Sequence, residues 1–280
     1  MLKIKFNYHK FKKNVPRYAV IVAACLIFFG MLQEKVFFMQ TTFLQDNLPN
    51  IAASNLKSYP CKIHFDKQKD KGLWLVNSKS RARKMQNKYN LFETDVHFNE
   101  ELKCLALTKK VRRKEVCYDE FLGSLNKPNE RFHWLDIQLI DEKNFKLAHQ
   151  YIETIAAKFN IKQRMILENR NAKFLTPLTQ KGFYTAFYIP WFETEKMSVT
   201  EIKNQINYIE NNLKRNQVCA ISAFANRLMF VKKYFPKFDF VSWWWLPWYA
   251  RIFDEVYILN KIKSYPQLTV FLEKNGRDVK

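Results

Sequence analysis

The chain of 280 residues carries 47 lysines and arginines against 26 aspartates and glutamates, a formal net charge of +21. Hydrophobic residues make up 48% of it, enough for the core of one barrel-sized domain or two small ones. It has only five glycines and neither G-x-G-x-x-G nor G-x-x-x-x-G-K, so nothing supports nucleotide binding by a glycine-rich loop. The charge favours anionic surroundings such as lipid headgroups, phosphorylated glycans or nucleic acid, although a solvated lysine-rich surface explains it equally well.

The N-terminus has the charge pattern of a membrane signal anchor. Residues 1–17 contain six cations and no acid, and residues 18–33 carry no charge. The six cations are Lys3, Lys5, Lys10, Lys12, Lys13 and Arg17. We expect a transmembrane helix over residues 18–39, with the charges of Glu34 and Lys35 reaching the headgroups. By the positive-inside rule, residues 1–17 form the cytoplasmic tail of a single-pass protein of the cell (inner) membrane, and the rest of the chain is extracytoplasmic.

Two other interpretations of this segment stay open. A cleaved signal peptide is the rival, although no small-x-small cleavage site follows the apolar run. Val22-Ala23-Ala24-Cys25 resembles a lipoprotein lipobox, in which Cys25 would be lipidated. Binding of nucleic acid would need the basic domain to face the cytoplasm, and the N-terminal charge bias contradicts that, so we expect no nucleic-acid partner.

Four cysteines lie beyond the predicted membrane segment: Cys61, Cys104, Cys117 and Cys219. An even number in an oxidising compartment permits two disulfides, with three possible pairings. Cys104 and Cys117 are the closest pair in sequence. The absence of any C-x-x-C argues against a zinc site.

After an irregular stalk over residues 40–71, short apolar runs alternate with amphipathic helical segments. The predicted strands are 73–76, 91–98, 132–140, 165–167, 184–189, 220–224, 238–246 and 268–272. The predicted helices are 78–88, capped by Ser78 or Asn77, then 119–126, 142–159, 172–180, 199–213, 226–235 and 251–262. Residues 102–108 either continue the second strand or form a hairpin with it. Eight strands alternating with helices predict an α/β fold, a (β/α)8 TIM barrel over residues 72–280, with a doubly wound open sheet as the alternative.

Polar side chains recur at the ends of three consecutive predicted strands. They are Glu93, Asp95 and His97 on the second strand, Asp136 and Gln138 on the third, and Glu168 and Arg170 on the fourth. In each set the residues are two apart and therefore share one face of the strand. Active sites of these barrels lie at the C-terminal strand ends, and buried carboxylates need a compensating partner. Oxygen ligands without soft donors predict Mg²⁺ or Ca²⁺, unless Arg170 simply neutralises Glu168 in a charge-paired core.

Over residues 72–272 the sequence resembles the glycerophosphodiester phosphodiesterase and phospholipase C-like superfamily. The resemblance is carried by Val76-Asn77-Ser78, Glu93-Thr94-Asp95-Val96, Trp134-Leu135-Asp136-Ile137 and Leu167-Glu168-Asn169-Arg170-Asn171, and later by Gly182-Phe183-Tyr184-Thr185, Ile189-Pro190-Trp191 and Ser242-Trp243-Trp244. It implies that Glu93, Asp95 and Glu168 hold a divalent cation.

The chain departs from the family pattern at the proton-transfer groups. The family uses two histidines as general acid and base, and the corresponding positions here hold Trp74 and Thr108, neither of which exchanges a proton near neutral pH. The usual third-strand lysine is Gln138. His97 is the one histidine predicted to share the face of the carboxylates, which makes it the candidate acid/base, with Arg170 stabilising the phosphoryl charge. His133 has the opposite parity and is expected to point away from the lumen.

Further candidates for substrate binding lie on the same rim. Lys109 and Lys110 open the basic run over residues 109–114, which either binds phosphate or forms a solvated loop. Trp244 belongs to the tryptophan-rich run over residues 243–248, which either stacks on a sugar, packs between barrel and helices or lies at the membrane interface. Asp136 and Gln138 complete the predicted substrate-binding set.

Two functions follow from these observations. The first is a membrane-anchored, metal-dependent phosphodiesterase acting on a glycerophosphodiester or a related anionic headgroup. The second is a catalytically inactive barrel that binds an anionic lipid, a glycan or a protein partner. Loss of both family histidines favours the second function, and the three converging strands of carboxylates favour the first.

Overall fold

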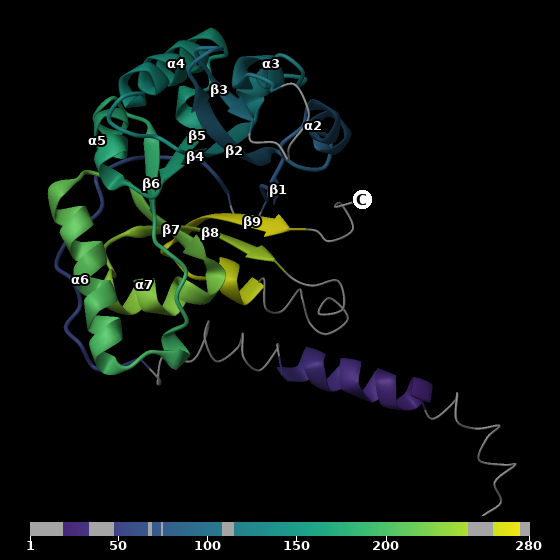
Figure 1. Ribbon diagram of the computed structural model, residues 1–280, viewed down its shortest axis with the longest axis vertical. Helices are drawn as coiled ribbons and strands as arrows, with labels where there is room; N and C mark the ends of the chain where they lie inside the picture. The colour runs from purple at the N-terminus through teal and green to yellow at the C-terminus, as the bar shows by residue number, and fades with distance from the viewer. Residues whose placement is uncertain are drawn as a thin grey trace, which may run out of the picture.

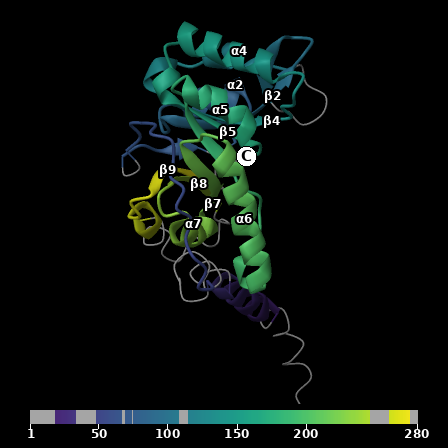
Figure 2. The same ribbon diagram turned by 90° about the vertical axis from the view of Figure 1, so that its left-hand side faces the viewer.

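The computed structural model describes residues 19–33, 48–66, 69–73, 75–107, 115–245 and 260–274. Within these ranges, eight parallel strands form a closed barrel surrounded by helices (Figures 1 and 2). In barrel order they are β1 (Gly72–Leu73), β2 (Leu91–Asn99), β4 (Phe132–Gln138), β5 (Met165–Asn169), β6 (Tyr184–Tyr188), β7 (Ala220–Phe224), β8 (Asp239–Trp245) and β9 (Leu268–Lys274). Because β1 pairs with both β2 and β9, the sheet has no free edge. The predicted TIM barrel is confirmed and the open sheet is wrong.

The ninth strand, β3 (Cys104–Leu107), lies outside this circle. It pairs antiparallel with the C-terminal part of β2, so the hairpin is the correct one of the two predicted arrangements. The helices are α2 (Lys79–Met85), α3 (Tyr118–Leu122), α4 (Phe145–Lys158), α5 (Ala172–Gln180), α6 (Val199–Arg215) and α7 (Leu228–Tyr234). The side chain of Ser78 accepts from the backbone N–H of Arg81 and caps α2. The predicted helix 251–262 falls mostly outside the described residues, of which 260–263 are helical.

Alternation along each strand separates two cores. Phe92 and Val96 face the outer helices, whereas Leu91 belongs to the lumen with Trp134, Leu272 and their neighbours. Gly72 is closely packed in the lumen, because a Cβ at this position would meet the side chains of Leu91 and Leu272.

Residues 48–66, predicted as part of a stalk, form neither helix nor strand, but they do not stand apart from the barrel. The N–H groups of Ser54 and Tyr59 donate to the carbonyls of Tyr234 and Val218, and Cys61 is disulfide-bonded to Cys219. The Phe65 ring packs against Phe132 at the N-terminal end of β4. This segment, which we call the strap, therefore covers the barrel end that lies opposite the C-terminal strand ends.

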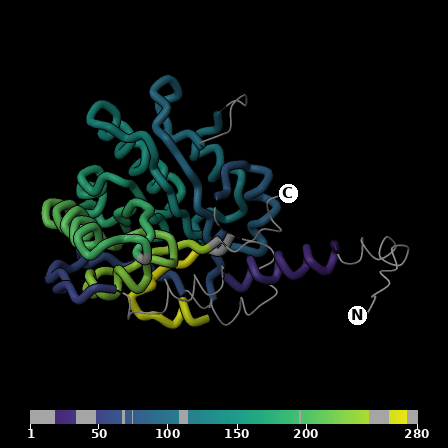
Figure 3. The backbone as a smooth tube through the Cα atoms, turned by 60° about the horizontal axis from the view of Figure 1, so that its bottom comes forward, coloured from purple at the N-terminus to yellow at the C-terminus, as the bar shows by residue number. Residues whose placement is uncertain are grey.

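The expected transmembrane helix is described over residues 19–33, which are helical and mostly exposed (Figure 3). No helix in the described ranges combines the length and the apolar character that crossing a membrane requires. Residues 18 and 34–39 of the predicted span lie outside those ranges, as do residues 1–17.

Loss of the strap disulfide should destabilise the barrel. The Cys61–Cys219 bond joins residues 158 positions apart, so breaking it releases a long loop in the unfolded chain. We expect Cys61→Ser to lower the free energy of unfolding by about 2–5 kcal/mol in chemical denaturation. Cys25→Ser, at the exposed free cysteine, is the matched control and should change nothing. A loss below about 0.5 kcal/mol in the Cys61 variant would contradict a stabilising role for this bond.

Candidate metal centre

Carboxylates from neighbouring strands lie at the same level of the barrel. Asp95 on β2 is in register with Asp136 on β4, and Asp136 is in register with Glu168 on β5. Glu93 lies two residues before Asp95 on the same inward face. Since parallel strands end at one side of a barrel, the fold brings these four acids to a common site.

Three of the acids form a compact cluster. One carboxylate oxygen from each of Glu93, Asp95 and Asp136 lies within 4.8 Å of the others. The Leu75 backbone N–H donates to Glu93 at 2.5 Å, the Asn77 amide to Asp95 at 3.3 Å, and the Gln138 amide to Asp136 at 3.2 Å. These donors orient the carboxylates without neutralising their charge.

Glu168 lies beside the cluster and has its own donors. Its Oε2 accepts hydrogen bonds from Trp134 Nε1 and Ser222 Oγ, each at 2.7 Å. Of the predicted ligand trio, the structure brings Glu93 and Asp95 together, and the third carboxylate within reach is Asp136, which we predicted as a substrate-binding residue.

The electrostatics of the cluster favour a cation. Burial raises the pKa of Glu93 and Glu168 well above the ordinary glutamate value, and the neighbouring Asp136 raises both further. Burial also raises the pKa of Asp95, and it raises that of Asp136 to about 6, with the charge of Asp95 adding to the shift. Closely spaced oxygen donors that resist ionisation together fit a hard divalent ion such as Mg²⁺ or Ca²⁺, whose charge would offset their repulsion.

The acids line a cavity of about 580 Å³ at the C-terminal strand ends. The described lining residues are Leu75, Glu93, Asp95, Trp134, Asp136, Gln138, Glu168, Arg170, Tyr188, Trp191, Phe224, Trp243 and Leu272. Arg170 is the one cation among them, and its guanidinium carbon lies 4.9 Å from the centre of the Tyr188 ring. A negative ligand entering the cavity would therefore meet one fixed positive group beside the acids.

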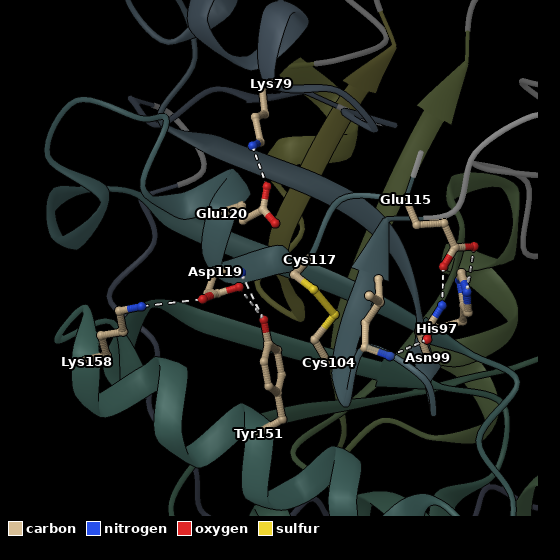
Figure 4. Close-up of a disulfide and its surroundings, with 11 residues drawn as sticks. Lys79, His97, Asn99, Cys104, Glu115, Cys117, Asp119, Glu120, Tyr151 and Lys158 are labelled. Atoms are coloured by element: carbon tan, nitrogen blue, oxygen red, sulfur yellow. Dashed lines mark hydrogen bonds and ion pairs between the residues drawn. A yellow bond between two sulfur atoms is a disulfide. The ribbon is translucent and has the colours of Figure 1, made fainter. Parts of the chain in front are cut away.

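His97 does not line this cavity. His97 is the last residue of β2 that pairs with β4, and it also belongs to the hairpin with β3. Its side chain lies in a separate hollow, with its Nε2 3.3 Å from Glu115 Oε1 (Figure 4). His133 is fully buried behind the strands, where Tyr118 and the Pro128 carbonyl are its hydrogen-bond partners, and burial lowers its pKa to about 4. No histidine is among the described residues that line the cavity.

Among the described lining residues of the cavity, β8 contributes Trp243. Trp244 has the opposite parity and packs into the outer core, where its ring stacks on Phe224 at 5.0 Å. The predicted phosphate-binding residues Lys109 and Lys110 lie outside the described residues, as do Trp74 and Thr108.

Several hydrogen-bond donors to the carboxylates were not predicted as site residues. Asn77, which binds Asp95 through both its side-chain oxygen and its amide, directly follows the predicted strand 73–76 and could have been recognised as a polar strand-end residue. The Ser222 hydroxyl and the Trp134 indole carry no comparable signal, since inward-facing serine and tryptophan are common in apolar strands.

Fold and site together define a TIM barrel with a carboxylate cluster at its C-terminal strand ends. No protein-family model and no curated protein matches the sequence. Similar solved structures include a glycerophosphodiester phosphodiesterase from Parabacteroides distasonis, 11% identical, covering 73% of this chain and 93% of its own with a TM-score of 0.46.

Two others are assigned to the same activity. The protein from Silicibacter pomeroyi is 7% identical and covers 79% of this chain and 93% of its own, with a TM-score of 0.47. The protein from Galdieria sulphuraria is 12% identical and covers 68% and 83%, with a TM-score of 0.40. All three bear the name of the superfamily that the sequence motifs resemble.

The burial of Asp136, together with the charge of neighbouring Asp95, predicts a stability gain for Asp136→Asn. An aspartate whose pKa is raised to about 6 binds its proton more tightly when folded, so its contribution to stability is lost as the pH rises from about 4 to about 6. Asparagine does not ionise and escapes this loss. At pH 7.5 without divalent ions, we expect the variant to exceed the wild type by about 2 kcal/mol in chemical denaturation, and near pH 4 by much less.

Exposed Glu142 at the rim is the control, and Glu142→Gln should leave the pH profile unchanged. An Asp136→Asn profile parallel to that of the wild type would show that neither burial nor the charge of Asp95 raises the pKa of Asp136.

Proposed function

We propose that this protein is a divalent-cation-dependent phosphodiesterase-like barrel acting on a glycerophosphodiester or a related anionic headgroup. The observation that carries the proposal is the cluster of Glu93, Asp95 and Asp136 in a cavity that also presents Arg170. Negative charge packed this closely is costly for a barrel core, and a divalent cation would compensate it. The bound cation and Arg170 would then attract an anionic phosphate group.

The cavity residues have distinct roles in this proposal. Glu93, Asp95 and Asp136 would hold Mg²⁺ or Ca²⁺, with Glu168 beside them, and the bound ion would stabilise negative charge on the phosphoryl group. Arg170 would bind the phosphoryl oxygens, and the Tyr188 ring fixes its guanidinium plane. Gln138, the neighbour of Asp136, is placed to donate a hydrogen bond to a substrate oxygen.

A second function, binding without turnover, is favoured by the absence of histidine among the described cavity residues. A phosphodiester needs a proton for its leaving group, and the groups that usually supply it near neutral pH are imidazoles. An inactive barrel would keep the cation and Arg170 to bind an anionic lipid, a glycan or a protein partner.

We also propose that the N-terminal segment anchors the protein in the cell membrane, with the barrel outside the cytoplasm. The six cations and uncharged run of residues 1–33 support this orientation, and the two disulfides fit an oxidising compartment.

The first test is calorimetric titration of Mg²⁺ and Ca²⁺ into the chelator-treated full-length protein. We expect one site, whose affinity falls at least about tenfold in Glu93→Gln, Asp95→Asn and Asp136→Asn because each removes a negative ligand. Glu142→Gln serves as the matched control for lost surface charge. Heat of binding that is equal in the wild type and all three site variants would refute the cation site.

Turnover separates the two functions. An enzyme should hydrolyse glycerophosphodiesters such as glycerophosphocholine in the presence of the bound ion and lose at least about a hundredfold in rate with Arg170→Ala, because the phosphoryl charge is left uncompensated. Cation and phosphate binding without turnover on any diester would establish the binding function instead.

A further inference from the structure

The carboxylates occupy only one side of the cavity. The other side is formed by four aromatic residues that follow one another around the barrel, which we call the aromatic wall: Tyr188 at the end of β6, Trp191 just beyond it, Phe224 on β7 and Trp243 on β8. An inorganic phosphate or a glycerol group held by Arg170 and the acids would leave this wall uncovered in a cavity of about 580 Å³.

The wall is contiguous with the proposed phosphate site. The Tyr188 and Trp243 rings stack with centroids 5.6 Å apart and an interplanar angle of 20°. Arg170 lies over the same Tyr188 ring, and the Trp134 ring, which binds Glu168, meets Trp243 edge to face at 6.2 Å. A ligand group bonded directly to a phosphate at Arg170 would therefore lie next to the aromatic wall.

Trp191 is the open member of the wall. More than half of its surface, 56%, is exposed, although its ring packs against Phe224 and Arg227. Its centroid lies 5.2 Å from that of Phe224, and the buried guanidinium of Arg227 lies 4.7 Å from its centre. A large ring that is both rigidly packed and open toward a cavity offers a flat surface at little cost in conformational entropy.

We propose that the aromatic wall is a subsite for a pyranose ring esterified to the phosphate, so that the ligand is a sugar phosphodiester. This inference rests on the proposed cation and phosphate site. The positively polarised C–H face of a sugar complements the negative faces of aromatic rings, while its hydroxyl groups can bond to Gln138 and the nearby carboxylates. An acyl chain fits less well, because the described lining residues include only two aliphatic side chains, Leu75 and Leu272.

The test compares small phosphate esters on the full-length protein with saturating Mg²⁺, by calorimetry. The probes are α-D-glucose 1-phosphate, glycerol 3-phosphate, adenosine 5′-monophosphate and inorganic phosphate. We expect glucose 1-phosphate to bind at least about tenfold more tightly than glycerol 3-phosphate. Trp191→Ala should bring these two affinities within about twofold and leave that of inorganic phosphate unchanged, whereas Trp191→Phe should keep most of the preference.

Tyr208→Ala, at an exposed aromatic residue on α6, is the control and should keep the full preference. Equal affinities for the two esters, tighter binding of the nucleotide, or an equal loss for all probes in Trp191→Ala would overturn the sugar subsite while leaving the proposed function intact. Failure of both Mg²⁺ and inorganic phosphate to bind would overturn both proposals.

Discussion

The C-terminal ends of the barrel strands are organised around the mutual repulsion of four carboxylates, those of Glu93, Asp95, Asp136 and Glu168. Each of these carboxylates has a fixed hydrogen-bond donor: the Leu75 N–H, the amides of Asn77 and Gln138, or the Trp134 indole with the Ser222 hydroxyl. Such donors reduce the cost of burying negative charge, but they do not remove the repulsion between charges. A strongly basic chain thus holds a close group of acids in its interior, where a counter-ion has much to contribute.

The opposite end of the barrel is built for cohesion. Phe65, Leu91 and Leu272 help to fill the lumen at the N-terminal ends of the strands, and Gly72 allows Leu91 and Leu272 to approach its backbone closely. The strap joins the loops before β7 and β8 through backbone hydrogen bonds and a disulfide. Separating these tasks allows the strand ends near the cavity to carry destabilising charge, because stability is supplied where no ligand binds.

The barrel could be predicted from sequence because apolar runs and helical periodicity are local properties. The acids were found because their two-residue spacing repeats on successive strands. Their grouping could not be predicted: whether Asp136 or Glu168 lies nearer to Glu93 depends on hydrogen bonds from Trp134 and Ser222, residues without a sequence signal of their own.

The remaining differences have similar causes. Alternation along β8 predicts that Trp243 and Trp244 lie on opposite faces of the strand. It does not tell which of these two identical residues faces the lumen. Alternation also fails to predict the place of His97: this residue is still in register with Gln138 of β4, but its side chain lies beside Glu115 in the hollow next to the hairpin. The strap is irregular in sequence and structure alike, and its attachment to the barrel is shown by contacts that have no local sequence signal: backbone hydrogen bonds, the packing of Phe65 on Phe132, and the pairing of Cys61 with Cys219.

The two disulfides also change what a protease can release. A single backbone cut between Cys61 and Cys219 leaves two fragments covalently joined, and a cut between Cys104 and Cys117 leaves the ends of the basic run over residues 109–114 held to the same hairpin. Trypsin has five possible sites in that run. A single cut at any of them would leave both fragments joined by the Cys104–Cys117 bond, so the protein would migrate as one chain on a non-reducing gel. Fragments produced by one cut inside either disulfide loop would therefore separate only after reduction.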